Sequence, residues 1–368
     1  MTNKATHTET LAQVLLPSQD LPLDMAFFTQ LGFRLDHIFP ADSPAVAMMS
    51  GFGLHIRLDK LAQIEPPVLH LLNDDPDRLA EGKREIIAPN GTVVHILPRI
   101  FQLDTPPTQH KFEVRQLQDK DPWVIGRAGM LYRDLIPDRL GGSIIASHIR
   151  IPVGGPVPDM VHYHTIGFQL IYCYSGWVKL VYEDQGAPFI LNAGDCVTQP
   201  PEIRHQVLEA SDKLEVIEIG VPAAHMTTID HDMVLPTQQF LPDRMFKGQT
   251  FCHHRLSESS WSPWRVHGLE HRDTGVNKAT QGIASVHVAR PAKSKDRPQL
   301  CSHNTDILFC FVTRGSLELQ AEGHPLKTLN MGDAFVMPPY LKYQFSNYTE
   351  DMELLEVSLP GNFQTFDH

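Results

Sequence analysis

An internal duplication restricts the folds open to this chain of 368 residues more than any other feature. Matching residues are 139 positions apart at first and 138 apart from Gly194 and Gly332 onwards, so one residue is missing from a turn, where deletion costs little. Each copy is far longer than a solenoid unit, which indicates a duplicated domain. The matched pairs include Arg133 and Arg272, His148 and His287, Pro152 and Pro291, His164 and His303, Gly176 and Gly315, Pro200 and Pro338, and Pro222 and Pro360.

Both copies consist of short segments rich in β-branched and aromatic residues, separated by Gly, Pro, Asn and Asp. This pattern predicts an antiparallel β-sandwich or barrel. The predicted strands are 144–151, 168–176, 177–183 and 213–219 in the first copy, and 283–289, 307–315, 316–322 and 352–359 in the second.

Residues 1–105 lie outside the repeat and show a different order of elements. A strand at 12–17 precedes a segment with helical spacing at 21–32, for which Gly32 is the expected C-cap. Three further strands complete a βαβββ unit, and a shortened second unit follows. The polar, proline-rich stretches 102–122 and 236–264 are predicted to be linkers or arms that cover sheet edges. We therefore expect three domains: 1–105, 106–235 and 236–368.

Composition narrows the class of protein. The formal net charge of −12 argues against a nucleic-acid partner, because phosphate binding requires a basic surface. Five cysteines without a CxxC pair fit a reducing compartment, and no segment is long and apolar enough for a membrane span. With no apolar signal segment near the start, we expect a cytoplasmic protein with a small-molecule substrate. Association into a homodimer stays open.

Residues 162–205 carry a pattern typical of a metal site. His162 and His164 are two residues apart on a predicted strand and therefore point to the same face. Gln169 and His205 would complete a set of nitrogen and oxygen donors that suits Fe, Mn, Ni, Cu or Zn. As a neutral ligand, Gln169 would leave the metal with its full charge; alternatively, its amide orients a histidine or a water molecule. Ile171 and Cys173 share its strand face and are predicted pocket walls.

This run resembles the two signature motifs of the cupin superfamily. Gln169 stands in place of the acid of the first motif, and Glu202 in place of a glycine of the second. With the duplication, the C-terminal part resembles a bicupin, which implies a mainly β protein with two tandem double-stranded β-helix barrels preceded by a small α+β βαβββ domain. The matching positions are His162, His164, Gly176, Gly194, Pro200 and His205.

The second copy keeps His303 but has lost the other ligand positions. Cys301, Leu308 and Tyr343 stand where the first copy has His162, Gln169 and His205, respectively. One imidazole and one thiol make a poor metal site. We therefore interpret the second barrel as structural, completing an intramolecular pseudo-dimer.

The N-terminal part resembles the glyoxalase-like, or vicinal-oxygen-chelate, fold through its βαβββ order and the turn at Pro89-Asn90-Gly91. In that fold, ligands come from the first and last strands of each unit. The resemblance therefore implies a second candidate site, although histidines of a chain with 20 of them also occur on strands by chance and face solvent. The residues at the four places are Gln13, His55, His70 and His95.

The cupin resemblance implies a metal-dependent enzyme. Three histidines match the metal-ligand positions of the motif, and folding alone does not require them. A mononuclear Fe(II) dioxygenase acting on a small oxygen-rich acid or enol is the expected function. One alternative is a redox-neutral isomerase, cyclase or lyase that uses Zn or Ni as a Lewis acid; Mn is a further candidate metal. Another is a non-enzymatic protein that binds a small molecule. The motif supplies ligands only, so no general acid or base is predicted.

Overall fold

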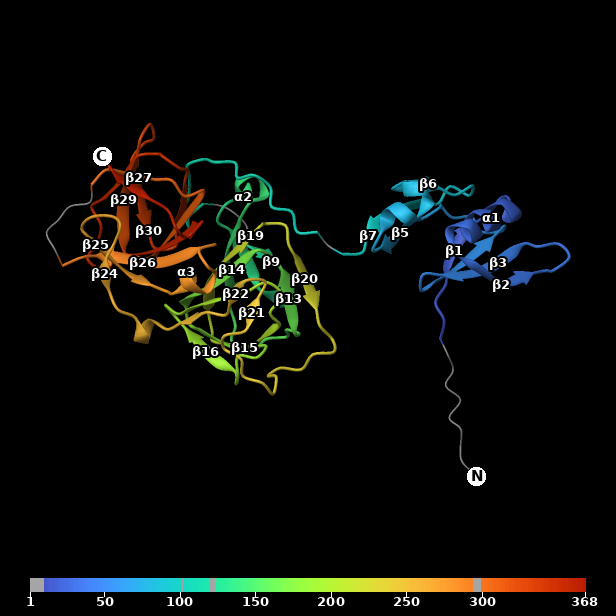
Figure 1. Ribbon diagram of the computed structural model, residues 1–368, viewed down its shortest axis with the longest axis horizontal. Helices are drawn as coiled ribbons and strands as arrows, with labels where there is room; N and C mark the ends of the chain where they lie inside the picture. Colours follow the sequence, from blue (N-terminus) through green and yellow to red (C-terminus); the bar gives the residue numbers. More distant parts are fainter. Residues whose placement is uncertain (1–9, 101, 120–122, 294–298) are drawn as a thin grey trace, which may run out of the picture. The chain divides into compact units, whose positions relative to one another are not determined.

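The computed structural model describes residues 10–100, 102–119, 123–293 and 299–368 and divides the chain into two compact units, Met1–Gln102 and Leu103–His368. The larger unit contains two β-barrels, which we call barrel 1 and barrel 2 (Figure 1). The predicted architecture is confirmed: a mainly β protein in which two antiparallel β-barrels follow a small βαβββ domain. Across the described ranges, no helix is long and apolar enough to cross a membrane.

The smaller unit begins with the predicted βαβββ order. Its helix starts after Asp20, whose side chain accepts a hydrogen bond from the Leu23 amide, and ends at Gly32, whose φ of 119° closes the last turn. The strands form a sheet of order β1-β4-β3-β2, in which β1 runs parallel to β4. Its elements are β1 (Val14–Pro17), α1 (Leu21–Leu31), β2 (Arg34–Phe39), β3 (Val46–Gly51) and β4 (Leu54–Asp59).

The shortened second unit is a three-stranded sheet of order β5-β7-β6. Two short 3-10 turns occupy the place of the helix. Leu69, Leu71 and Val94 of this sheet share one core with Leu16 and Phe28 of the first part, so the smaller unit has a single hydrophobic core. The strands are β5 (Val68–Asn73), β6 (Glu85–Ile87) and β7 (Val93–Pro98).

Barrel 1 consists of two facing antiparallel sheets. The first has the order β23-β17-β14-β19-β11-β10-β9 and the second the order β16-β15-β18-β13-β20. The strands that carry most of the argument are β10 (Leu131–Asp134), β11 (Ile145–Ile151), β13 (His162–Thr165), β14 (Phe168–Ser175), β15 (Trp177–Tyr182), β17 (Cys196–Thr198), β18 (His205–Ala210), β19 (Leu214–Val221) and β20 (Met226–Ile229).

Barrel 2 repeats this topology, with sheets of order β24-β25-β26-β33-β28-β31-β8 and β30-β29-β32-β27-β34. Its principal strands are β25 (Leu269–Asp273), β26 (Ser285–Pro291), β27 (Cys301–His303), β28 (Ile307–Arg314), β29 (Ser316–Ala321), β31 (Ala334–Met337), β32 (Tyr343–Ser346) and β33 (Glu353–Leu359).

The two barrels share a hydrophobic core between their larger sheets. Leu170, Tyr172 and Ile217 of barrel 1 pack in one cluster with Phe309 and Val357 of barrel 2. Along β14 the alternate residues point away from this core into barrel 1, which agrees with the alternation predicted for that strand. The shared core is what an intramolecular pseudo-dimer requires.

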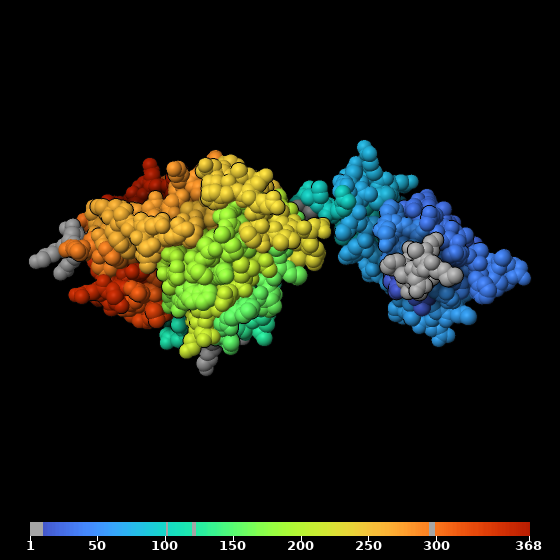
Figure 2. Space-filling view, turned by 90° about the horizontal axis from the view of Figure 1, so that it is seen from below, coloured from blue at the N-terminus to red at the C-terminus, as the bar shows by residue number. Residues whose placement is uncertain are grey.

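The stretches predicted as linkers or arms are exchanged between the barrels. Strand β8 (Glu113–Arg115), which precedes barrel 1, pairs with β31 of barrel 2. Strand β23 (His253–His254), which precedes barrel 2, pairs with β17 of barrel 1. Figure 2 shows the segment 236–264, coloured yellow to orange, spread over the surface of the larger unit. Each barrel therefore has one sheet edge covered by a strand from the other copy's arm.

Two buried arginines at equivalent positions of the two copies each form a hydrogen bond to the other barrel. Arg133 of barrel 1 donates to the Gly332 carbonyl at 3.3 Å, and Arg272 of barrel 2 donates to the Gly194 carbonyl at 3.0 Å. Gly194 and Gly332 are themselves equivalent. The contact is therefore reciprocal, as in the isologous interface of a twofold dimer.

Candidate metal centre

Three histidines converge inside barrel 1. His162 and His164 lie on β13, and His205 begins β18, where it pairs directly with His162 across the antiparallel ladder. All three side chains are buried, and one ring nitrogen of each lies within 4.8 Å of the others. No other group of three or more His, Cys, Asp or Glu residues meets this distance in the described part of the chain. The structure thus brings together the three histidines predicted from the sequence.

Hydrogen bonds set the protonation of these rings. His162 Nδ1 lies 2.7 Å from the Met160 carbonyl and His205 Nδ1 lies 3.0 Å from the Ile203 carbonyl. A carbonyl oxygen can only accept, so both Nδ1 atoms carry the proton and both Nε2 atoms keep a lone pair. His164 Nδ1 is 2.9 Å from the Thr227 hydroxyl. His162 Nε2 is buried and has no protein partner.

Burial also favours the neutral rings that bind metals. Desolvation lowers the pKa of all three histidines, and that of His164 falls to about 2. Nearby positive or imidazole groups add to the lowering in each case. A buried imidazole with a free, unprotonated Nε2 costs free energy unless something binds that nitrogen. The donor set therefore fits a divalent metal.

The turn that delivers His205 is tied to the strands that carry the other predicted ligands. The Gln199 amide donates to the Gln169 carbonyl, and the Glu202 amide donates to the His164 carbonyl, both at 3.0 Å. Glu202, which stands where the cupin motif has glycine, has a φ of 66°, the left-handed region that glycine occupies most easily. Its equivalent in barrel 2, Tyr340, has a φ of 64°, so both copies keep the same turn without the glycine.

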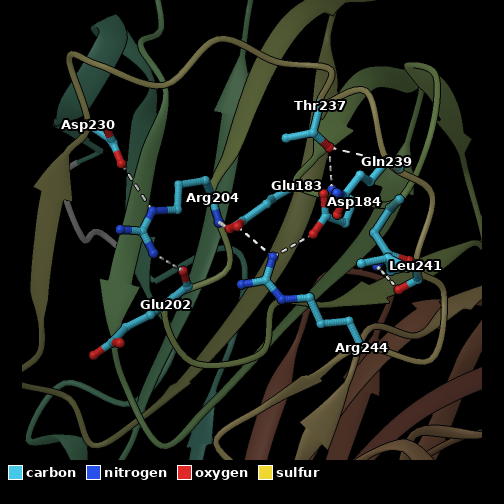
Figure 3. Close-up of polar contacts among 10 residues, drawn as sticks. Glu183, Asp184, Glu202, Arg204, Asp230, Thr237, Gln239, Leu241 and Arg244 are labelled. Atoms are coloured by element: carbon cyan, nitrogen blue, oxygen red, sulfur yellow. Dashed lines mark hydrogen bonds and ion pairs between the residues drawn. The ribbon is translucent and has the colours of Figure 1, made fainter.

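A buried acidic pair fastens the arm between the barrels next to this turn (Figure 3). Arg244 of the arm donates to Glu183 at 2.6 Å and to Asp184 at 2.5 Å. Glu183 also accepts a hydrogen bond from the Arg204 amide at 3.2 Å, directly before His205. Arg204 in turn pairs with Asp230 at 3.1 Å. The arm is thereby connected to the backbone that positions His205.

Gln169 points into barrel 1 and has one free end. Its amide nitrogen donates to Glu218 at 2.5 Å, while its oxygen is buried without a partner. Glu218, on the neighbouring strand β19, is a carboxyl that the motif does not predict; burial raises its pKa, and the hydrogen bond from Gln169 opposes that rise. This arrangement leaves the Gln169 oxygen available as a ligand, which stays a prediction.

Two of the three histidines open onto a cavity of about 270 Å³ inside barrel 1. His164, His205 and Ile171 belong to its wall, in keeping with the predicted position of Ile171. Cys173 does not belong to this wall: it packs in the core of the barrel, where burial raises the pKa of its thiol to about 12. It therefore has no reactive thiolate near neutral pH.

Sequence reasoning missed the titratable groups of this cavity. Arg127 lines it and pairs with the buried carboxylate of Asp159, and Glu218 and His225 line it as well. A repeat comparison would have singled out Glu218, because Glu356 is the equivalent acid in barrel 2. Arg127 comes from a short 3-10 turn before β10 and carries no recognisable motif.

In barrel 2 an arginine lies where the metal ligands of barrel 1 have their counterparts. Arg265 forms a two-pronged ion pair with Glu356 and donates to the Tyr343 hydroxyl at 2.8 Å. Burial, and to a smaller extent the positive charge of Arg265, lowers the pKa of His303 to about 4. The guanidinium thus supplies positive charge at the centre of a barrel in which Cys301 and Tyr343 have replaced two of the three histidines, which supports the structural interpretation of barrel 2.

The four residues predicted for a second site in the smaller unit lie in two pairs. Gln13 and His55 border one hollow beside the four-stranded sheet. His70 and His95 stack on the three-stranded sheet, with 3.3 Å between His95 Nδ1 and His70 Nε2, and His95 Nε2 lies 3.2 Å from Glu85. The three histidines do not form a group with ligand atoms within 4.8 Å of one another.

Comparison with known proteins supports the fold. No family model matches the chain, and no curated protein matches its sequence. Among solved structures, salicylate 1,2-dioxygenase from Pseudoaminobacter salicylatoxidans aligns with a TM-score of 0.52 at 13% identity, over 72% of this chain and 90% of that one. Oxalate decarboxylase from Bacillus subtilis aligns with a TM-score of 0.52 at 13% identity, over 74% of this chain and 81% of that one. At such identities the likeness establishes a duplicated cupin fold.

Proposed function

We propose that this protein is a metal-dependent enzyme with one mononuclear centre held by His162, His164 and His205, with Gln169 as fourth ligand. The observation that carries the proposal is the set of buried, neutral imidazoles, two with Nδ1 fixed by a backbone carbonyl and one with an unpartnered Nε2. A divalent metal held there would bind and acidify two oxygens of a substrate and, as Fe(II), would supply oxygen chemistry.

Fe(II)-dependent dioxygenation of a chelating acid or enol is the reaction that we favour. Arg127 supports an anionic substrate, because it is a cation in the cavity wall whose position is set by the buried Asp159. The fold likeness to salicylate 1,2-dioxygenase, one structure of which is a complex with gentisate, is compatible with this class of substrate.

A redox-neutral isomerase, cyclase or lyase using Zn or Ni is the second candidate. The all-neutral donor set favours it, because no carboxylate joins the three histidines within 4.8 Å in the described residues. Such a set leaves the metal its full positive charge, which strengthens a Lewis acid. Mn is compatible with either reaction.

Anaerobic purification followed by metal analysis and oxygen-uptake measurements tests these proposals. We expect one metal per chain, lost in the double variant His162→Ala/His164→Ala and kept in His70→Ala/His95→Ala, the matched pair in the smaller unit. Unchanged stoichiometry in the first variant would refute the centre. Iron-loaded protein that consumes no oxygen with any chelating acid or enol would refute the dioxygenase, while ligand binding without turnover would identify a binding protein.

We also propose that the smaller unit is glyoxalase-like, which its βαβββ order supports, and that the chain has three domains, 1–105, 106–235 and 236–368, of which the last two together form the larger unit. A cytoplasmic location, a small-molecule substrate and assembly as a homodimer complete the proposal. Sedimentation velocity of the purified protein tests the last point.

A further inference from the structure

The cavity of barrel 1 changes from polar to apolar along the barrel axis. Strands β11 and β19 pair antiparallel, and their cavity-lining residues form successive cross-strand pairs. Ile145, opposite Gly220, lines the cavity at the metal end; the next pair, Ser147 with Glu218, is polar, and the two pairs beyond it are aliphatic. In order along the barrel, the three pairs are Ser147 with Glu218, Ile149 with Val216, and Ile151 with Leu214.

The opposite sheet shows the same gradient. On strands β15 and β18, Tyr182 pairs with the metal-site residue His205. One step further along the barrel, Leu180 pairs with Val207, and Val178 follows at the far end, opposite Ala210. All of these residues except Ala210 line the cavity.

Hydrogen bonds show that both gradients run in the same direction. At the metal end, the Gln199 amide of the turn before His205 donates to the Gln169 carbonyl, and the Gln169 side chain contacts Glu218. At the far end, Ser211 accepts from the Trp177 amide, next to Val178, and from the Leu214 amide through its carbonyl. The polar layers therefore share the metal end, and the aliphatic layers form a floor of Ile151, Val178, Leu180 and Leu214.

We propose that the substrate has a chelating oxygen head and an apolar alkyl or aryl body, with the head at the metal and the body on this floor. This inference rests on the proposed function and alters one part of the sequence expectation, that of an oxygen-rich acid. Oxygens placed on the floor would lose their water without gaining a donor, because its side chains are aliphatic. An apolar body gains from the same burial, by about fourfold in affinity for each methylene group.

Straight-chain hydroxamic acids test this proposal, because they bind metals through two oxygens and differ only in the alkyl chain. We would titrate Zn-loaded protein with the series from acetohydroxamate to octanohydroxamate by isothermal calorimetry. Affinity is expected to rise about three- to fourfold per methylene until the chain reaches the floor, and then to level off. Metal-loaded protein that binds acetohydroxamate but shows no dependence on chain length would overturn the proposal and leave the metal centre intact.

The variant Val178→Phe tests the position of the body. It narrows the floor, so the rise in affinity should stop at a shorter chain while metal content and acetohydroxamate affinity stay as in the wild type. Ile190→Phe, on the exposed face of the neighbouring strand β16 (Phe189–Asn192), is the matched control and should leave the whole series unchanged. A Val178→Phe profile identical to the wild type would refute the assigned floor. If that variant does not fold, the wild-type series alone decides the proposal; protein that retains no metal would instead refute the proposed function.

Discussion

Replacement of Arg265 by methionine should destabilise the larger unit strongly. Its partner Glu356 has a side chain that is 1% exposed, so loss of the guanidinium leaves a carboxylate buried without a countercharge. Breaking a buried ion pair from one side costs about 3–5 kcal/mol. With a urea m-value of roughly 3 kcal/mol/M, a loss of about 4 kcal/mol lowers the unfolding midpoint by about 1.3 M.

Two further variants separate this effect from a general loss of packing. Arg290→Met breaks a pair with Glu270 in the same barrel, at 2.7 Å but partly exposed, and should cost less than about 1 kcal/mol. In Arg265→Met/Glu356→Gln the buried charge is gone as well, so at least about 2 kcal/mol should be regained. Urea unfolding followed by circular dichroism measures all three. A double variant less stable than Arg265→Met, or an Arg265→Met no worse than Arg290→Met, would refute the reasoning.

Three other outcomes follow from the geometry. Arg244→Ala should weaken metal affinity about tenfold in a chelator competition, because Glu183 then no longer holds the turn before His205. Arg255→Ala, which breaks the exposed ion pair with Glu258 in the same arm, should leave metal affinity unchanged. Arg133→Met and Arg272→Met should each cost about 3 kcal/mol in urea unfolding, and clearly unequal losses would contradict the reciprocal contact. The pKa of His303 is about 4 in the folded protein against an ordinary 6.5, so the unfolded chain takes up this proton at a higher pH than the folded one. The free energy of unfolding should therefore fall by up to about 1.4 kcal/mol per pH unit between pH 6.5 and pH 4. In His303→Gln, the free energy of unfolding should depend less steeply on pH over this range.

The sequence by itself determined the duplicated barrels and the three-histidine group. Both depend on local periodicity: residues two apart on a strand share a face, so His162 and His164 had to point together once the strand formed. The repeat then located the turn that delivers His205. The loss of ligands at Cys301 and Tyr343 was also readable directly.

Tertiary structure alone decided what surrounds those histidines. Arg127, Glu218 and Arg265 act through partners 32, 49 and 91 positions away, and nothing in a local pattern selects such partners. The exchange of arms between the barrels and the polar-to-apolar gradient of the cavity depend on strand pairing and register, which are settled by packing over the whole sheet. Side-chain periodicity predicts to which face of a strand a residue points, whereas the residue that it contacts there comes from a distant part of the chain.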